Sequence, residues 1–109
     1  MKSVSKTVDA STAGTYYFGF TEAQRAGAYS AKITITGNNS NISTETIADT
    51  IILAEDTVTS SIGVGPYNVA YGCKAIFNGR TGNIATSNPY SSGGYYFPCN
   101  ITVVLYYLE

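Results

Sequence analysis

The chain has 109 residues, of which six are Lys or Arg, seven are Asp or Glu and none is histidine. It therefore lacks the usual general base of enzyme sites and the commonest metal ligand, so we expect neither an enzyme nor a protein that needs a metal or cofactor. A formal net charge of −1 without any run of like charges argues against nucleic acid or an anionic membrane surface as a partner.

Length and hydropathy predict one domain with a single core. No apolar run reaches the roughly 20 residues of a membrane span, so we expect no membrane insertion, and the first residues lack the apolar stretch of a Sec signal peptide. Residues 1–13 are polar, which predicts an arm, or a weak strand that pairs only in an assembly. We expect residues 14–109 to form a single β-sandwich domain.

The first predicted elements follow this arm. Residues 15–20 predict a short strand with aromatic side chains on one face. Thr21 and Gln24 then match a capping box, which predicts one or two helical turns ended by Gly27. No other segment predicts a helix.

Residues 29–36 give the clearest strand signal, because apolar and polar side chains alternate throughout. Such alternation is typical of an antiparallel sheet with one buried and one solvated face. Weaker alternation predicts further strands at 44–54, 58–64, 67–77 and 95–108.

The segment 78–94 is rich in Gly, Asn and Ser, and it is long for a loop in a small domain. We expect it to be functional, to be mobile, or to contain a short strand around Asn83–Thr86. Asn78-Gly79 favours a type I′ turn with Arg80 at its apex. One interpretation of this turn is a solubilising hairpin tip. The alternative is a binding site, since Tyr and Arg dominate interface energetics; its residues would be Asn78, Arg80, Asn83, Tyr90 and Tyr95.

The last predicted strand, 95–108, is apolar on both faces. One face fits the core. The second face, with Tyr96, Val104 and Tyr106, would leave an apolar stripe in solvent, and such stripes mark contact surfaces. We therefore expect these three residues in a subunit interface.

The two cysteines, Cys73 and Cys99, both fall on the core-facing side of their predicted strands. A disulfide between them would close a loop of about 26 residues and stabilise the fold by roughly 3.5 kcal/mol. Two buried free thiols fit the pattern equally well. In either state we expect both residues to be inaccessible.

Taken together, about six to eight short strands and at most one short helix predict an all-β fold, an antiparallel β-sandwich or jelly roll. The Thr/Asn/Gly-rich strands, the polar segment Lys2–Ala13 and the Tyr-rich segment Tyr95–Tyr107 resemble the small β-structured virion proteins of tailed bacteriophages, such as head-decoration, head-fibre and tail-associated subunits. This resemblance implies a trimeric or otherwise symmetric sandwich anchored to a larger particle, in a virion or extracellular location.

Two functions fit this sequence. The first is a structural or attachment module that acts through protein–protein contacts in a homo-oligomer and a larger assembly. The alternative is a small lectin-like or adhesin domain that binds a glycan or host receptor through Tyr and Asn in residues 78–94. Tyrosine suits such a site because it gives large contact area at low entropic cost.

Overall fold

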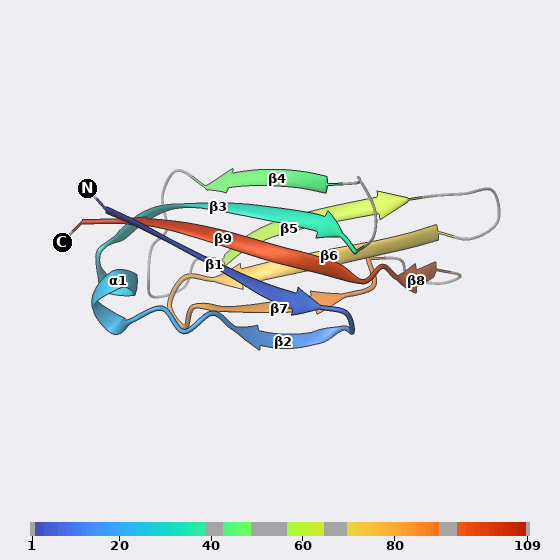
Figure 1. Ribbon diagram of the computed structural model, residues 1–109, viewed down its shortest axis with the longest axis horizontal. Helices are drawn as coiled ribbons and strands as arrows, with labels where there is room; N and C mark the ends of the chain where they lie inside the picture. Colours follow the sequence, from blue (N-terminus) through green and yellow to red (C-terminus); the bar gives the residue numbers. More distant parts are fainter. Residues whose placement is uncertain (1, 39–42, 49–56, 65–69, 90–93, 109) are drawn as a thin grey trace.

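The protein folds as two β-sheets that face each other across one core, which confirms the predicted all-β sandwich (Figure 1). The computed structural model describes residues 2–38, 43–48, 57–64, 70–89 and 94–108, and these residues form nine strands and one short helix. The described residues contain no helix long and apolar enough to cross a membrane.

The first sheet has the strand order β1-β9-β3-β4, and every neighbouring pair in it is antiparallel. Its strands are β1 (Lys2–Ala10), β9 (Cys99–Tyr107), β3 (Ala28–Gly37) and β4 (Ser43–Ala48). The central strand β9 therefore has a partner on both edges. The predicted continuation of β4 to residue 54 lies outside the described residues.

The second sheet has the order β2-β7-β6-β5, also antiparallel. Its strands are β2 (Gly14–Tyr17), β7 (Asn83–Ser87), β6 (Ala70–Asn78) and β5 (Thr57–Val64). A three-residue strand, β8 (Gly94–Tyr96), extends this sheet by pairing in parallel with residues 70–72 of β6. The short strand expected around Asn83–Thr86 is thus present as β7.

The expectation of a polar arm over residues 1–13 is wrong for the segment Lys2–Ala10. This segment pairs with β9 along its whole length as strand β1. Val4 and Val8 point inward and pack against the core, while Ser5 and Thr7 point to solvent. The inward Lys6 keeps its amine solvated and donates a hydrogen bond to the Gly19 carbonyl, 3.3 Å away. The alternation of Val4, Lys6 and Val8 with short polar residues is the sequence signal that indicates this strand.

The predicted strand over 95–108 is in fact two strands that belong to different sheets. Tyr96 ends β8 in the second sheet, and Cys99 begins β9 in the first. Pro98 lies between them, and it has no N–H with which to continue a ladder of hydrogen bonds. The chain crosses from one sheet to the other at this point, so the alternation of β9 does not continue into Tyr95 and Tyr96.

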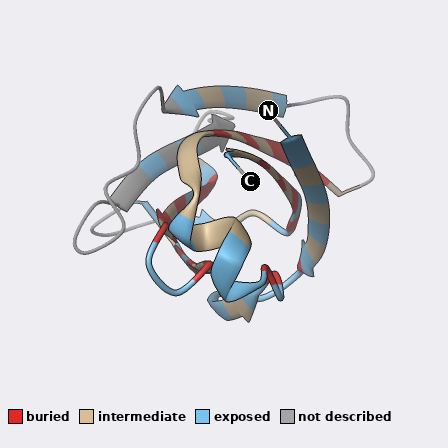
Figure 2. Cartoon of the chain, turned by 90° about the vertical axis from the view of Figure 1, so that its left-hand side faces the viewer, coloured by how far each residue is buried: buried red, intermediate tan, exposed pale blue. Residues whose placement is uncertain are grey.

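The core fills the space between the sheets, and it follows the predicted period of two in β3, β6 and β9. At one end it holds an aromatic cluster, in which Phe18 stacks on Phe20 at 5.6 Å and both rings meet the edge or face of Phe77. Seen along the long axis, the strands curve around these buried residues (Figure 2). Helix α1 (Glu22–Ala26) lies across the same end, beside both termini.

Helix α1 has the predicted boundaries for the predicted reasons. The Thr21 hydroxyl accepts a hydrogen bond from the Gln24 N–H at 3.1 Å, and the Gln24 side chain accepts from the Thr21 N–H at 2.9 Å. The helix ends at Gly27, which is held against the end of the chain, since the Leu108 N–H donates to the Gly27 carbonyl at 2.8 Å. A β-carbon at position 27 would collide with the Leu108 carbonyl oxygen.

Candidate functional site

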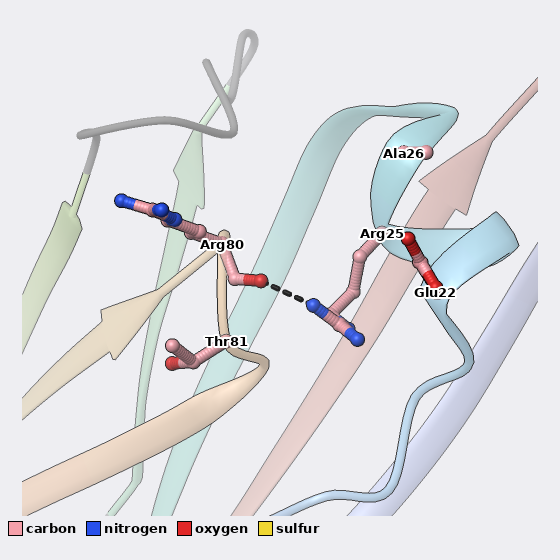
Figure 3. A pocket seen from close by; sticks show the side chains of 5 residues that line it. All are labelled: Glu22, Arg25, Ala26, Arg80 and Thr81. Carbon is pink, nitrogen blue, oxygen red and sulfur yellow. Dashed lines mark hydrogen bonds between the residues drawn. The ribbon is translucent and has the colours of Figure 1, made fainter.

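A pocket of about 400 Å³ lies between α1 and the loop that joins β6 to β7 (Figure 3). Its lining brings together two segments far apart in the sequence: Glu22, Arg25 and Ala26 from the helix, and Arg80 and Thr81 from the loop. Two guanidinium groups and one carboxylate thus occur at one small hollow, which suits polar or ionic contacts.

The loop beside this pocket has a different form from the predicted type I′ turn. Four residues, 79–82, connect the strands, and the side-chain oxygen of Asn78 accepts hydrogen bonds from the N–H groups of Arg80 and Thr81 at 2.9 and 3.2 Å. Gly82 closes the loop at a φ of 73°, a conformation that favours glycine. Asn78 therefore shapes the loop with its side chain, whereas a type I′ turn would have needed positive φ at its two central residues.

Arg25 fastens the helix to this loop. Its Nη1 donates to the Arg80 carbonyl, and its Nε donates to the Phe20 carbonyl at 3.4 Å. The Arg80 side chain extends away from Arg25, while its carbonyl points toward it (Figure 3). Arg25 is thus a structural tie between α1 and the loop, and Arg80 is the exposed cation at the rim. Sequence reasoning missed Arg25, whose contacts join positions 55 residues apart.

The predicted binding residues do not form one site. Asn78, Arg80 and Asn83 lie together at the β6–β7 loop, where Asn78 and Asn83 are paired across the strands. Tyr95 pairs instead with Tyr71, at the opposite end of β6. Tyr71 and Asn78 are seven residues apart on this strand, which corresponds to about 23 Å. Figure 1 shows β8 and α1 at opposite ends of the molecule. Tyr90 lies outside the described residues.

Tyr95 belongs to a second surface feature, a stacked aromatic pair. Its ring lies 5.4 Å from that of Tyr71, with an angle of 28° between the planes. Both rings are partly in solvent, Tyr95 by 56% and Tyr71 by 38%. The parallel register of β6 and β8 produces the pair, because it sets these two residues directly side by side. An exposed aromatic stack of this kind offers a flat apolar surface with polar hydroxyls at its edge.

Of the predicted interface residues, Val104 and Tyr106 lie where expected, on the solvent side of β9. They are half-buried by neighbouring side chains, since β9 is the central strand of its sheet. Tyr96 does not join them, and its assignment to this face is wrong. Because the chain changes sheets at Pro98, the Tyr96 side chain packs against the core, and its hydroxyl donates to the Ala10 carbonyl at 2.8 Å.

The face around Val104 and Tyr106 is built mainly of short polar side chains. One row across the four strands reads Ser5, Val104, Lys32 and Ile47, and Ile47 is 62% exposed. We call this surface the outer face of the first sheet. Its other side chains are mostly hydroxyl-bearing, and they are Ser3, Thr7, Ser30, Thr34, Thr36, Ser43 and Thr102. Thr7 and Thr102 share a hydrogen bond of 2.8 Å, and Lys32 lies 3.9 Å from Glu45.

The two cysteines meet in the core from opposite sheets. Cys73 comes from β6 and Cys99 from β9, and both are fully buried free thiols. Cys73 also donates to the Tyr96 hydroxyl at 3.6 Å, and Cys99 donates to the Phe97 carbonyl at 3.0 Å. The predicted burial of both thiols is confirmed.

These contacts move the pKa values of the cluster in opposite directions. The neighbouring Cys99 side chain lowers the pKa of the Cys73 thiol to about 7, against burial, which raises it. Cys73, together with burial, raises the pKa of Cys99. Burial raises the pKa of the Tyr96 phenol. Cys73 is therefore the thiol of the pair that ionises first.

Among the described residues, no group of three or more Cys, Asp or Glu side chains is arranged to hold a metal ion. No protein-family model, curated protein or solved structure matches this chain.

Proposed function

We propose that this protein is a non-enzymatic structural or attachment module that acts through protein–protein contacts in a symmetric assembly. The observation that carries this proposal is the outer face of the first sheet. There Val104, Tyr106 and the exposed Ile47 lie among short hydroxyl side chains. Most side chains of this face are short and uncharged, so it can stack closely on a second sheet, as the two sheets of a sandwich do.

A second copy of the chain is the occupant that this face suits best. The face carries Lys32 together with the carboxylates of Glu45 and Asp9, so it presents both signs of charge. In a two-fold contact the same surface of both copies meets, and every contact occurs twice. Lys32 of one copy can therefore approach a carboxylate of the other copy. The chain as a whole has a net charge of −1, which opposes self-association very little.

The resemblance of the sequence to small virion proteins supports a location in the virion of a tailed bacteriophage, outside the host cell. A trimer is one form that such an assembly can take. Mass spectrometry of purified virus particles checks this setting. We expect the chain in the particles at a defined ratio to the main capsid or tail protein. Its presence only in the free protein fraction would contradict a virion role.

The assembly itself is tested by Tyr106→Lys, which places a charge at the apolar part of the outer face. We expect the oligomer mass in size-exclusion chromatography with light scattering to fall, because a buried unpaired charge is costly. The β-sheet circular dichroism should not change. Tyr17→Lys is the matched control, since Tyr17 is 73% exposed on the second sheet. A wild-type monomer at high concentration, or equal masses for both variants, would count against the proposal.

A second candidate function, glycan binding, is favoured by the Tyr71–Tyr95 stack. Aromatic faces in solvent bind the apolar face of a pyranose ring, and the tyrosine hydroxyls can bond to its hydroxyl groups. This site is at the β8 end of the molecule, away from the Asn78 and Arg80 loop. A glycan array tests it: Tyr95→Ala should lose the binding that wild type shows, and Tyr17→Ala should keep it. A wild type that binds no glycan excludes this function.

A further inference from the structure

Two free thiols from opposite sheets lie in the core of the sandwich. Cys73 belongs to the second sheet and Cys99 to the first, and each is fully shielded from solvent. Phe97 lies against both strands: its carbonyl accepts the hydrogen bond of the Cys99 thiol at 3.0 Å, and its N–H donates to the carbonyl of Gly72, the neighbour of Cys73, at 2.8 Å. These contacts place the two thiols in one small part of the core, where a bond between them can form.

We infer that Cys73 and Cys99 form an inter-sheet disulfide when the chain folds in the presence of a small-molecule disulfide oxidant. The bond would fasten β6 to β9, the central strands of the two sheets. It would thus act on the interface between the layers, where the two sheets are otherwise held by side-chain packing. A particle protein working outside a reducing cell would gain most from such a bond.

The chemistry is two successive exchanges with oxidised glutathione. The Cys73 thiol loses its proton, and its thiolate attacks one sulfur of the oxidant and releases one glutathione thiolate. The Cys99 thiol then loses its proton and attacks the Cys73 sulfur of the mixed disulfide, which releases the second glutathione. Two protein thiols are oxidised to one cystine, and one glutathione disulfide is reduced to two glutathione thiols.

The surroundings of the pair indicate which cysteine acts first and how the oxidant reaches it. Cys73 has its sulfur beside the Tyr96 hydroxyl, 3.6 Å away, and ionises before Cys99. Tyr96 lies in β8, whose three residues make it the shortest strand among those described. Release of β8 during folding would uncover Cys73 for the oxidant.

The test compares one wild-type preparation refolded in two buffers, one with oxidised and reduced glutathione and one with a strong dithiol reductant. We expect the first sample to be a monomeric chain lighter by two hydrogen atoms in intact mass spectrometry. Neither cysteine should then react with an alkylating reagent in denaturant. Its Tm should exceed that of the reduced sample by on the order of 10 °C, because the cross-link closes a loop of about 26 residues.

Three results would overturn the inference: full alkylation of both cysteines after oxidative refolding, disulfide-linked dimers in place of the internal bond, or an oxidised form with a lower Tm than the reduced form. Cys73→Ser and Cys99→Ser provide the control, since each should remove the difference in Tm between the two buffers. The comparison within wild type remains decisive if either variant fails to fold.

Discussion

The hydroxyl group of Tyr96 connects three strands through its hydrogen bonds. From β8 it donates to the carbonyl of Ala10 at the end of β1, and it accepts the hydrogen bond of Cys73 on β6. Sequence parity along 95–108 places this side chain on the opposite face, because nothing in the local pattern except Pro98 reports that the chain changes sheets. Its role depends on partners 86 and 23 residues away.

Replacing Tyr96 by Phe removes this hydroxyl and keeps the ring. We expect the free energy of unfolding near neutral pH to fall by about 1–3 kcal/mol, because a buried carbonyl and a buried thiol lose their partner. Tyr95→Phe is the control, since the Tyr95 side chain is 56% exposed. Urea titrations followed by circular dichroism measure both variants, and equal stability of the two would refute the role of this hydroxyl.

The same residue predicts a pH dependence. Burial raises the pKa of Tyr96 above the ordinary value of 10.0, so the folded protein keeps a proton that the unfolded chain releases. The stability that this effect contributes is complete below pH 10 and falls as the pH rises further. We therefore expect wild type to lose stability faster than Tyr96→Phe when urea titrations are repeated above pH 10. Parallel losses in both proteins would show that Tyr96 has no part in it.

Gly27 is fixed by its surroundings rather than by its backbone angles. A methyl group there would meet the Leu108 carbonyl, whereas one at Gly14 would meet nothing within 4 Å. We expect Gly27→Ala to lower the free energy of unfolding by on the order of 1–3 kcal/mol, even though alanine favours helices. Gly14→Ala should change it by less than about 0.5 kcal/mol. Thermal denaturation distinguishes the two, and a Gly27→Ala protein as stable as Gly14→Ala would contradict the collision.

At the scale of elements, the strands with strict alternation are predictable and their partners are not. β3 and β9 follow the period of two because each has one face on the core. The pairing of β1 with β9, and the choice of sheet for β8, depend on contacts between distant parts of the chain. The same reason explains the candidate sites: residues 78–83 are local and lie together, whereas the Tyr71–Tyr95 stack requires the parallel register of two strands.

Strand β1 gives a direct test of this difference. Val8→Asp places a carboxylate on the inner side of β1, against the core, and we expect it to lower the free energy of unfolding by about 1–3 kcal/mol. Ser5→Asp places the same charge on the exposed side of the same strand and should change it by less than about 0.5 kcal/mol. In a free arm both substitutions would be neutral, so equal melting temperatures would argue that β1 does not pair with β9.

At the scale of the whole molecule, the candidate surfaces occupy different places. The Arg25–Arg80 pocket and both termini are at one end, the Tyr71–Tyr95 stack is at the other, and the outer face of the first sheet runs between them (Figure 1). A contact between copies through the outer face would leave the β8 end free. This division of surfaces cannot be predicted from composition, because it arises only when both sheets are assembled.

The pairing of Lys2 with Tyr107 also governs how the molecule responds to tension. Because β1 and β9 are antiparallel, the start of β1 lies beside the end of β9. A force applied to Lys2 and Tyr107 therefore separates the hydrogen-bonded pairs one after another, like a zipper. A pull between Lys2 and Asn100 would load all of these pairs at once, in shear. We expect single-molecule force spectroscopy to show a lower rupture force for the first attachment than for the second. A tether attached through both ends would therefore release this protein under a modest load, whereas a load carried across the length of β1 and β9 would be resisted.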